Sequence, residues 1–180
     1  QTLANVVFET EKGLNARIFV PGRNWSRSFQ WDGGFISIGL TEISKPLAIK
    51  SLDALFENGN HRQWKPEYMD TNPPIHIFAI EEIYESFDDL NLLKHFLPLA
   101  WSSLERMCRY GDPDRDNLYD WGLPRKIYAF SSGMDFLPVW NFARAQEPFR
   151  RIESPDFSAL LVRDFKIVAV LARQAGMEKI

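Results

Sequence analysis

Residues 90–109 decide the fold, and they read LNLLKHFLPLAWSSLERMCR. Apolar residues recur there at spacings of three and four, which is the period of an α-helix with one buried face. They are Leu92, Leu93, Phe96, Leu97, Ala100, Leu104, Met107 and Cys108. Pro98 lies inside the pattern and predicts a kink or a helix break, because proline lacks the amide hydrogen that a helix interior uses.

The same period recurs on both sides of this stretch, so the fold class is predicted to be mainly α. Helices are expected over about 32–43, from Ser44 to Asn58–Asn60, over 75–87, over 90–109, and from Ser154–Pro155 to Gly176. Short connections between them favour antiparallel helical hairpins. Residues 1–30 form an irregular lead-in in which Val6–Phe8 and Arg17–Val20 are typical of short strands, and residues 31–180 form the helical domain.

Composition excludes several classes of partner. The 180 residues are 45% hydrophobic and 25% charged, which is typical of a soluble globular chain. A net charge of −3 without a basic patch argues against nucleic acid, and the apolar runs are too short for a membrane span. The start at Gln1 has neither an initiator Met nor a signal-peptide pattern, so an internal or processed start is expected. Cytoplasmic and exported locations both stay open.

The segment from Gly111 to Glu153 has no helical period, although patterned helices flank it. It is rich in aromatic residues, which disordered segments lack. Loops of this length inside compact domains are usually functional or disordered, so an ordered functional loop is expected. The segment carries Asp135, and an acid among aromatic side chains suits a carbohydrate site, where rings cover sugar faces and carboxyls bind hydroxyls or donate protons.

Four motifs occur in a fixed order along the chain. They are FQWDGGF at 29–35, NPP at 72–74, DRDNLYDWG at 114–122 and SGMD at 132–135. Together they resemble the catalytic domain of glycoside hydrolases of the family 63 and trehalase type, over roughly residues 20–177. The resemblance implies the N-terminal part of an (α/α)6 toroid. It also implies inverting hydrolysis of an α-linked glucoside or mannoside, such as a disaccharide, a glycosylglycerate or a short oligosaccharide.

By this resemblance Asp135 is the general acid, which protonates the leaving oxygen as the glycosidic bond breaks. Such an acid must keep its proton near neutral pH, and burial against apolar groups raises a carboxyl pKa in that way. Phe130, Met134 and Phe136 are close enough in sequence to form that apolar wall. The local alternative is an Asp that accepts backbone hydrogen bonds in a turn.

The resemblance also implies residues that bind the sugar. Trp31 would be a sugar platform and Asp32 a hydroxyl acceptor, although a packed Trp beside a helix N-terminal acid is the structural alternative. Trp121 is a further candidate for a sugar contact. Asn72 stands where relatives often have Gln and reaches less far. The loop before Pro73 adds three candidates, which are Gln63, His61 and Trp64.

No cofactor is required, and the metal content stays open. Asp112, Asp114, Asp116 and Asp120 occupy positions one, three, five and nine of a loop like that of an EF-hand. Position six is Asn117 rather than Gly, and position twelve is Leu123 rather than Glu. A structural Ca²⁺ and a solvated acidic turn are both consistent with this spacing. His76 and His95 lack ligand spacing, so core or surface roles are favoured over zinc.

The chain departs from the family in two respects. An inverting glycosidase needs a second carboxyl as base, which this family places late in the domain, and no residue here is nominated for that role. The stretch after Asp135 reads FLPVW, without the Arg that follows the acid in relatives. About five helices are expected where a toroid needs about twelve, so a companion polypeptide or a C-terminal segment is expected to complete it. The alternative function is a non-catalytic carbohydrate-binding or assembly module on the same helices.

Overall fold

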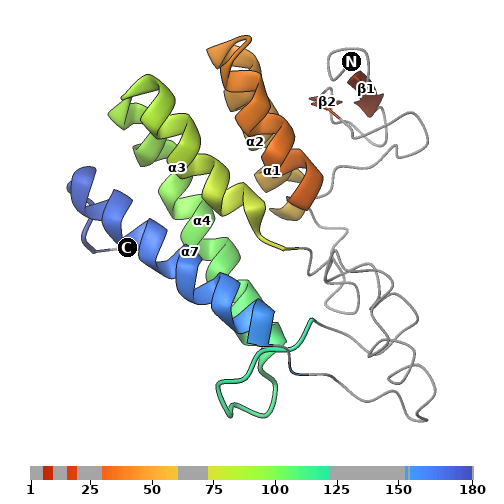
Figure 1. The fold of residues 1–180 in the computed structure, drawn as a ribbon, viewed down its shortest axis with the longest axis vertical. Helices are drawn as coiled ribbons and strands as arrows, with labels where there is room; N and C mark the ends of the chain where they lie inside the picture. Colours follow the sequence, from red (N-terminus) through yellow and green to blue (C-terminus); the bar gives the residue numbers. More distant parts are fainter. Residues whose placement is uncertain are drawn as a thin grey trace.

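The computed structural model describes residues 6–9, 16–19, 30–60, 73–121, 153 and 155–179. These residues form five α-helices and one two-stranded antiparallel sheet (Figure 1). The strands are β1 (Val6–Glu9) and β2 (Ala16–Phe19). The helices are α1 (Gln30–Thr41), α2 (Lys45–Asn60), α3 (Ile75–Phe87), α4 (Leu90–Gly111) and α7 (Pro155–Gln174). The predicted mainly α class is therefore confirmed for this part of the chain.

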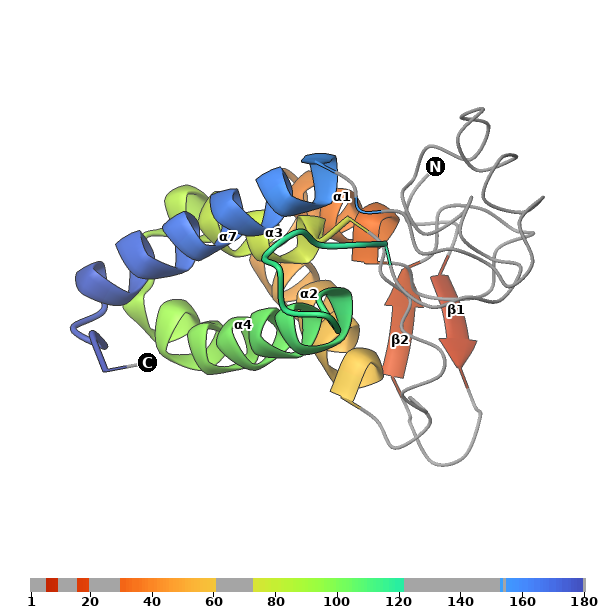
Figure 2. The ribbon, with the colours of Figure 1, turned by 90° about the horizontal axis from the view of Figure 1, so that it is seen from below.

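The helices form two layers, and the described helices alternate between them in chain order (Figures 1 and 2). One layer contains α1, α3 and α7 with α3 in the middle, and the other contains α2 and α4. Residues 42–44 join α1 to α2, and residues 88–89 join α3 to α4. Such short connections return the chain at once, so each pair is an antiparallel hairpin as predicted.

Local signals set the ends of the helices. At the start of α2 the carbonyl of Ser44 accepts a hydrogen bond from the amide of Ala48 at 3.0 Å. Asp89 caps α4 by accepting the amide of Asn91 at 3.0 Å. After α7, Gly176 adopts φ +67°, a left-handed conformation that glycine reaches without strain and that commonly ends helices. The observed bounds differ from the predicted ones by two residues or so, because helix ends are fixed by such local bonds.

A helix break at Pro98 is not observed, so that alternative was wrong. α4 runs without interruption from Leu90 to Gly111 with Pro98 inside it. The side chain of Pro98 lies on the exposed face of the helix. Water can therefore replace the hydrogen bond that proline cannot make, and the buried face continues across the proline.

α3 is the centre of the hydrophobic core. Its isoleucines at positions 75, 77, 80 and 83 are all buried, and they form the wide apolar stripe of a helix that packs on several sides. Buried residues of the other helices meet them, including Leu40, Leu52, Phe56, Leu93, Phe96, Leu97, Leu104, Phe157, Leu161 and Val168. Burial of each such side chain contributes about 1.5–3 kcal/mol. Within the described ranges, no helix has the length and apolar character that crossing a membrane requires.

Candidate functional site

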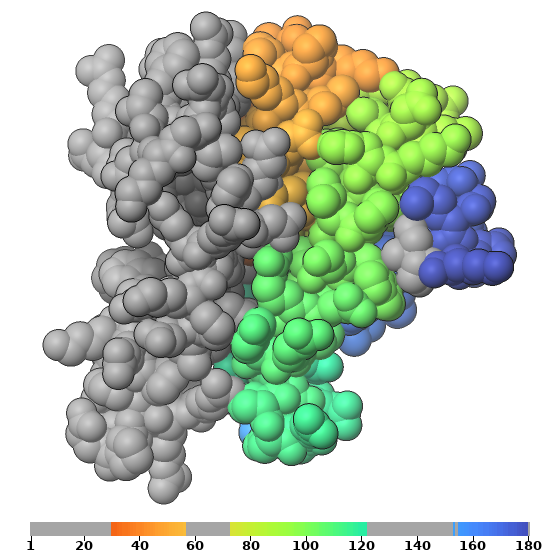
Figure 3. Space-filling model, turned by 180° about the vertical axis from the view of Figure 1, so that it is seen from behind, coloured from red at the N-terminus to blue at the C-terminus, as the bar shows by residue number. Residues whose placement is uncertain are grey.

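Three of the four sequence motifs lie at one end of the helical layers. The N-terminal ends of α1, α3 and α7 point the same way, and α4 runs in the opposite direction into the turn of residues 112–121 (Figure 1). That turn projects at the end of the α2–α4 face (Figure 3). Three motif segments therefore lie at the same end of the helical layers: the first turn of α1 with Trp31 and Asp32, the Pro73–Pro74 pair before α3, and the part of the third motif up to Trp121.

Two glycines bring α1 close to its neighbours at this end. A Cβ atom on Gly34 would lie 2.7 Å from the carbonyl carbon of Ile75 and 2.9 Å from the amide nitrogen of His76. A Cβ atom on Gly33 would overlap the side chain of Leu55 in α2. The glycines of the Trp31–Asp32 motif thus allow the start of α1 to touch the start of α3, which is a packing role that glycine alone can fill.

Trp31 and Asp32 lie in the first turn of α1. Both are partly exposed, and the Trp31 ring meets the Phe35 ring edge-on at 5.8 Å between centroids. Asp32 is the acid of the first turn, where the helix dipole favours a carboxylate. This placement leaves part of each side chain accessible to a ligand, and contact with a sugar stays a prediction for both.

Trp121 is buried, with only 1% of its surface exposed. One face of its ring stacks on Phe157 of α7 at 4.4 Å between centroids, and its Nε1 donates a hydrogen bond to Asp156 at 3.2 Å. These contacts join the 112–121 turn to the first turn of α7. A sugar contact by Trp121 stays a prediction, and its environment in this structure is that of a core residue.

The residues before Trp121 are tied to the same helices. The amide of Tyr119 donates to Oγ of Ser158 at 3.2 Å, and the amide of Asp120 donates to the carbonyl of Gly111 at 2.8 Å. Asp120 is buried and also forms an isolated antiparallel bridge with Glu153. Backbone bonds on both sides therefore hold the exit of the turn in place.

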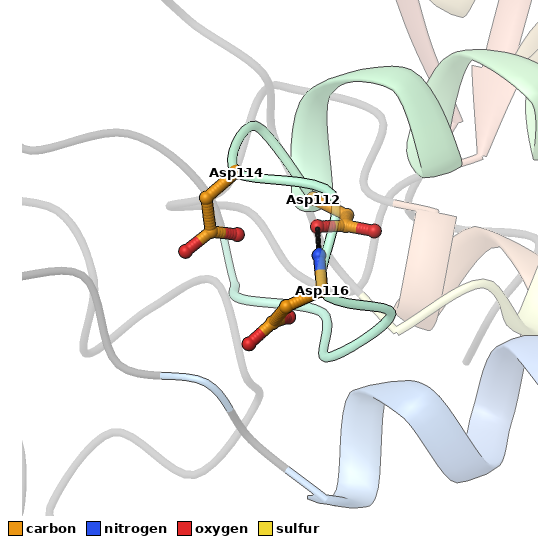
Figure 4. A group of neighbouring side chains, drawn as sticks. All are labelled: Asp112, Asp114 and Asp116. Atoms are coloured by element: carbon orange, nitrogen blue, oxygen red, sulfur yellow. Dashed lines mark hydrogen bonds between the residues drawn. The ribbon is translucent and has the colours of Figure 1, made fainter.

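The acidic turn consists of Asp112, Asp114 and Asp116, whose carboxylates face one another (Figure 4). One oxygen from each lies within 4.8 Å of the others. Asp112 accepts the amide of Asp116 at 3.0 Å and the amide of Asn117 at 3.1 Å. The three charges, led by that of Asp116, raise the pKa of the nearby Glu153 carboxyl above its ordinary value.

A divalent cation would relieve this crowding. Carboxylate oxygens are the ligands that Ca²⁺ prefers, and Glu153 would be a fourth carboxylate beside the acidic turn. Ca²⁺ takes at least six oxygens, however, and two oxygens of Asp112 already accept backbone amides. Asp120, the fourth acid of the sequence pattern, is not part of the group of three. The oxygen ligands are of the kind that a cation prefers, but the described residues, at one oxygen from each carboxylate, supply fewer than six. A structural Ca²⁺ and a solvated acidic turn therefore both stay open.

Three candidates from the sequence lie outside the described residues. They are the general acid Asp135 and the sugar contacts Gln63 and Asn72. His61, Trp64 and the apolar wall expected around Asp135 lie outside them as well. The described part of the site therefore consists of Trp31, Asp32, Trp121 and the acidic turn.

Sequence reasoning missed a buried acid on α7. Asp164 has 0% of its surface exposed, and burial raises the pKa of its carboxyl to about 7. It falls on the apolar stripe of α7, three residues after Leu161 and three before Ile167. That position was the available signal, because an acid on the core face of a helix must be partnered or protonated. His76 was expected in a core or surface role, and it lies in the core.

No protein-family model matches this chain, and comparison with the curated proteins and with the solved structures gave no significant match.

Proposed function

We propose that this chain is the acid-bearing part of an inverting glycosidase that hydrolyses an α-linked glucoside or mannoside. The observation that supports this proposal is that three motif segments, far apart in sequence, lie at the same end of the helical layers (Figure 1). Enzymes built on paired helical layers can place a substrate at such an end, because several helix termini and loops meet there. Glycosidic bonds in a disaccharide, a glycosylglycerate or a short oligosaccharide are the proposed substrates.

Asp135 is proposed as the general acid that protonates the leaving oxygen. Trp31 would cover the apolar face of a sugar ring, and Asp32 would accept hydrogen bonds from its hydroxyls. Asn72, Gln63 and Trp121 are proposed as further sugar contacts. No metal takes part in this chemistry, since proton transfer by carboxyl groups suffices.

The second carboxyl is proposed to come from outside this chain. Inverting hydrolysis needs an acid and a base about 6.5–9.5 Å apart, with a water molecule between the base and the sugar. A further segment or a companion polypeptide would supply the base and continue the two layers into an (α/α)6 toroid. The alternation of helices between the layers supports this arrangement, as do the exposed apolar residues Phe35 of α1 and Val162 and Val170 of α7, on the two helices that flank α3.

The test begins with mass spectrometry of the purified protein under native and then denaturing conditions, which identifies any companion. The assembly is then assayed on α-linked disaccharides, with NMR of the anomeric proton of the first product formed. We expect Asp135→Asn to lose turnover while sugar binding is largely kept. Asp88→Asn is the matched control and should keep full activity, because this exposed Asp lies between α3 and α4, at the opposite end of the layers from the motifs. Unchanged turnover in Asp135→Asn would refute the proposed acid.

A non-catalytic carbohydrate-binding or assembly module is the competing function. It is favoured by the FLPVW stretch after Asp135, which lacks the Arg that follows the acid in the family it resembles, and by the absence of a nominated base in the sequence. Such a module would bind sugar without turnover even when every chain of the assembly is present. Release of a reducing sugar with inverted configuration by the complete assembly would exclude it.

A further inference from the structure

The core between α3, α4 and α7, called the α7 seam below, has one buried ionisable side chain on the α3–α4 side and one on α7. The first is His76 of α3, which is 1% exposed. Its Nε2 lies 3.2 Å from Oγ of Ser103 in α4, and its ring meets the ring of Phe56 in α2 at 5.0 Å between centroids. Its Nδ1 is buried without a partner. A proton added to this ring would leave a charge with no acceptor at Nδ1.

The second is Asp164 of α7, which is fully buried. The guanidinium of Arg163 contacts Oδ1 twice, through Nε at 2.8 Å and through NH2 at 2.6 Å. Both contacts use the same oxygen, so Oδ2 is left buried without a partner. A carboxylate fully satisfied by arginine would use both oxygens, and this one is therefore poorly compensated when ionised.

Each helix of the seam contributes charges around these two groups. Arg163 of α7 is paired with Asp164 and is also close enough to repel a proton from His76. Arg106 of α4 repels that proton as well. Glu81 of α3 disfavours a negative charge on Asp164. On the α2 side, the aromatic ring of Phe56 faces His76 and carries no charge.

Burial makes the two groups respond to pH in opposite directions. Desolvation, helped by Arg106 and Arg163, lowers the pKa of His76 from 6.5 to about 3, so its contribution to stability is lost as pH falls from about 6.5 towards 3. Desolvation raises the pKa of Asp164 from 3.8 to about 7. The contribution of Asp164 is therefore present below pH 3.8 and is lost as pH rises to about 7. Between about pH 4 and 6.5 the two slopes have opposite signs.

We propose that the α7 seam is a pH-balanced joint. In it, the opposite pH responses of His76 and Asp164 keep the free energy that holds α7 against α3 and α4 nearly constant from mildly acidic to neutral pH. The first turn of α7 carries Asp156 and Phe157, which hold Trp121. The joint thus keeps the Trp121 segment in place across this range. The relevance of that segment to a sugar rests on the proposed function, whereas the balance of the joint does not.

The test compares urea unfolding of the wild type with that of Asp164→Asn, His76→Gln and the double variant, at intervals between pH 4 and 8. Only the change with pH of each difference from the wild type is used, so a constant loss of packing does not matter. From about pH 4 to 7, we expect the unfolding constant of Asp164→Asn to fall about tenfold per pH unit relative to that of the wild type, so the variant becomes relatively more stable as pH rises. Up to about pH 6.5, the unfolding constant of His76→Gln should rise about tenfold per pH unit relative to that of the wild type. Over the range in which both groups titrate, the stability of the double variant should change with pH about as that of the wild type does.

Glu105→Gln is the control, because it removes an exposed acid from α4. A flat difference curve for either single variant, like that of the control, would overturn the proposal. If Asp164→Asn does not fold, Glu81→Gln replaces it. The charge of Glu81 helps to raise the pKa of Asp164, so in this variant the loss of stability caused by Asp164 should be complete at a lower pH. An unchanged upper limit in Glu81→Gln would count equally against the joint. Hydrogen exchange of the amides of residues 155–174 measures the stability of α7 itself. If the differences between variant and wild type in the protection of these amides did not change with pH, the assignment to α7 would be overturned.

Discussion

α1 and α7 flank α3 from opposite sides, yet they pack in different ways. At the start of α1, Gly34 comes so close to Ile75 that a single added carbon would clash. α7 instead inserts the large side chain of Phe157 into the core and buries the ionisable Asp164. The contact of α1 therefore depends on the absence of side-chain atoms at its glycines, and the contact of α7 depends on large and ionisable side chains. The first should be insensitive to pH and to truncation elsewhere, whereas the second should be sensitive to both.

The largest effect is expected from removing atoms on the α7 side. Phe157→Ala would leave a cavity beneath the stacked ring of Trp121, at a position with 0% exposure. We expect a loss of about 3–5 kcal/mol in the free energy of unfolding, measured in urea. Trp121 should also become more exposed, which a red shift of the tryptophan emission would report.

Phe35→Ala on α1 is the matched control for that truncation. Phe35 is 48% exposed, so its removal should cost less than about 1 kcal/mol. Equal losses in the free energy of unfolding for Phe157→Ala and Phe35→Ala would mean that the packing of α7 does not depend on its large buried side chains.

A smaller effect is expected from adding one carbon on the α1 side. Gly34→Ala places a methyl group against the backbone of α3, which cannot move aside as a flexible side chain can. Overpacking of this kind costs about 1–3 kcal/mol, and the helix propensity of Ala offsets only part of it. We expect a net loss of about 1–2 kcal/mol in urea unfolding.

Gly39→Ala tests the same substitution at an open position of α1. No atom lies within 4 Å of a Cβ there, so the better helix propensity of Ala should stabilise the protein by about 0.5–1 kcal/mol. The two Gly→Ala changes should therefore have opposite signs. A gain in Gly34→Ala would show that α1 and α3 can separate without cost.

The smallest effect is expected at the acidic turn, which joins the end of α4 to the Trp121 segment. The neighbouring aspartates raise the pKa of Glu153, so its contribution to stability is lost as pH rises through that raised value. Glu153→Gln should consequently raise the melting temperature at neutral pH, and 0.5 M NaCl should remove the gain by screening. If Glu153→Gln lowered the melting temperature in metal-free buffer, repulsion between Glu153 and the three aspartates would be contradicted.

Calcium titration distinguishes the two interpretations of the same turn. A bound Ca²⁺ would raise the melting temperature of the wild type at micromolar to millimolar concentrations, and Asp116→Asn would weaken that rise. Equal responses to Ca²⁺ and to the same ionic strength of NaCl would identify a solvated acidic turn.

Much of the fold could be predicted because its signals are local. The helical period and the terminating Gly176 involve residues within a few positions of one another, and the predicted helices match the observed ones closely. The error at Pro98 also has a local cause. A proline disturbs a helix less when it faces solvent, and the apolar pattern around it already placed it on the exposed side.

Less of the candidate site could be predicted, because burial depends on distant residues. A sugar contact by Trp121 stays a prediction, and the sequence did not indicate that its ring stacks on Phe157, which lies far along the chain. The glycines beside Trp31 and Asp32 were noticed as part of a motif, but their role in packing needs the position of Ile75. Asp164 stood on an apolar stripe without being singled out, since the orphaned Oδ2 exists only once α3 and α4 enclose it.

The sequence by itself therefore determined the helices, their order and their short hairpin connections, because these follow from hydrogen bonds and side-chain periodicity within each segment. The tertiary structure decided that α1, α3 and α7 share a layer, that Gly34 touches Ile75, and that His76 and Asp164 lose contact with water. Those outcomes depend on contacts between residues many positions apart, whose free energies come from burial and exclusion of water rather than from local propensity.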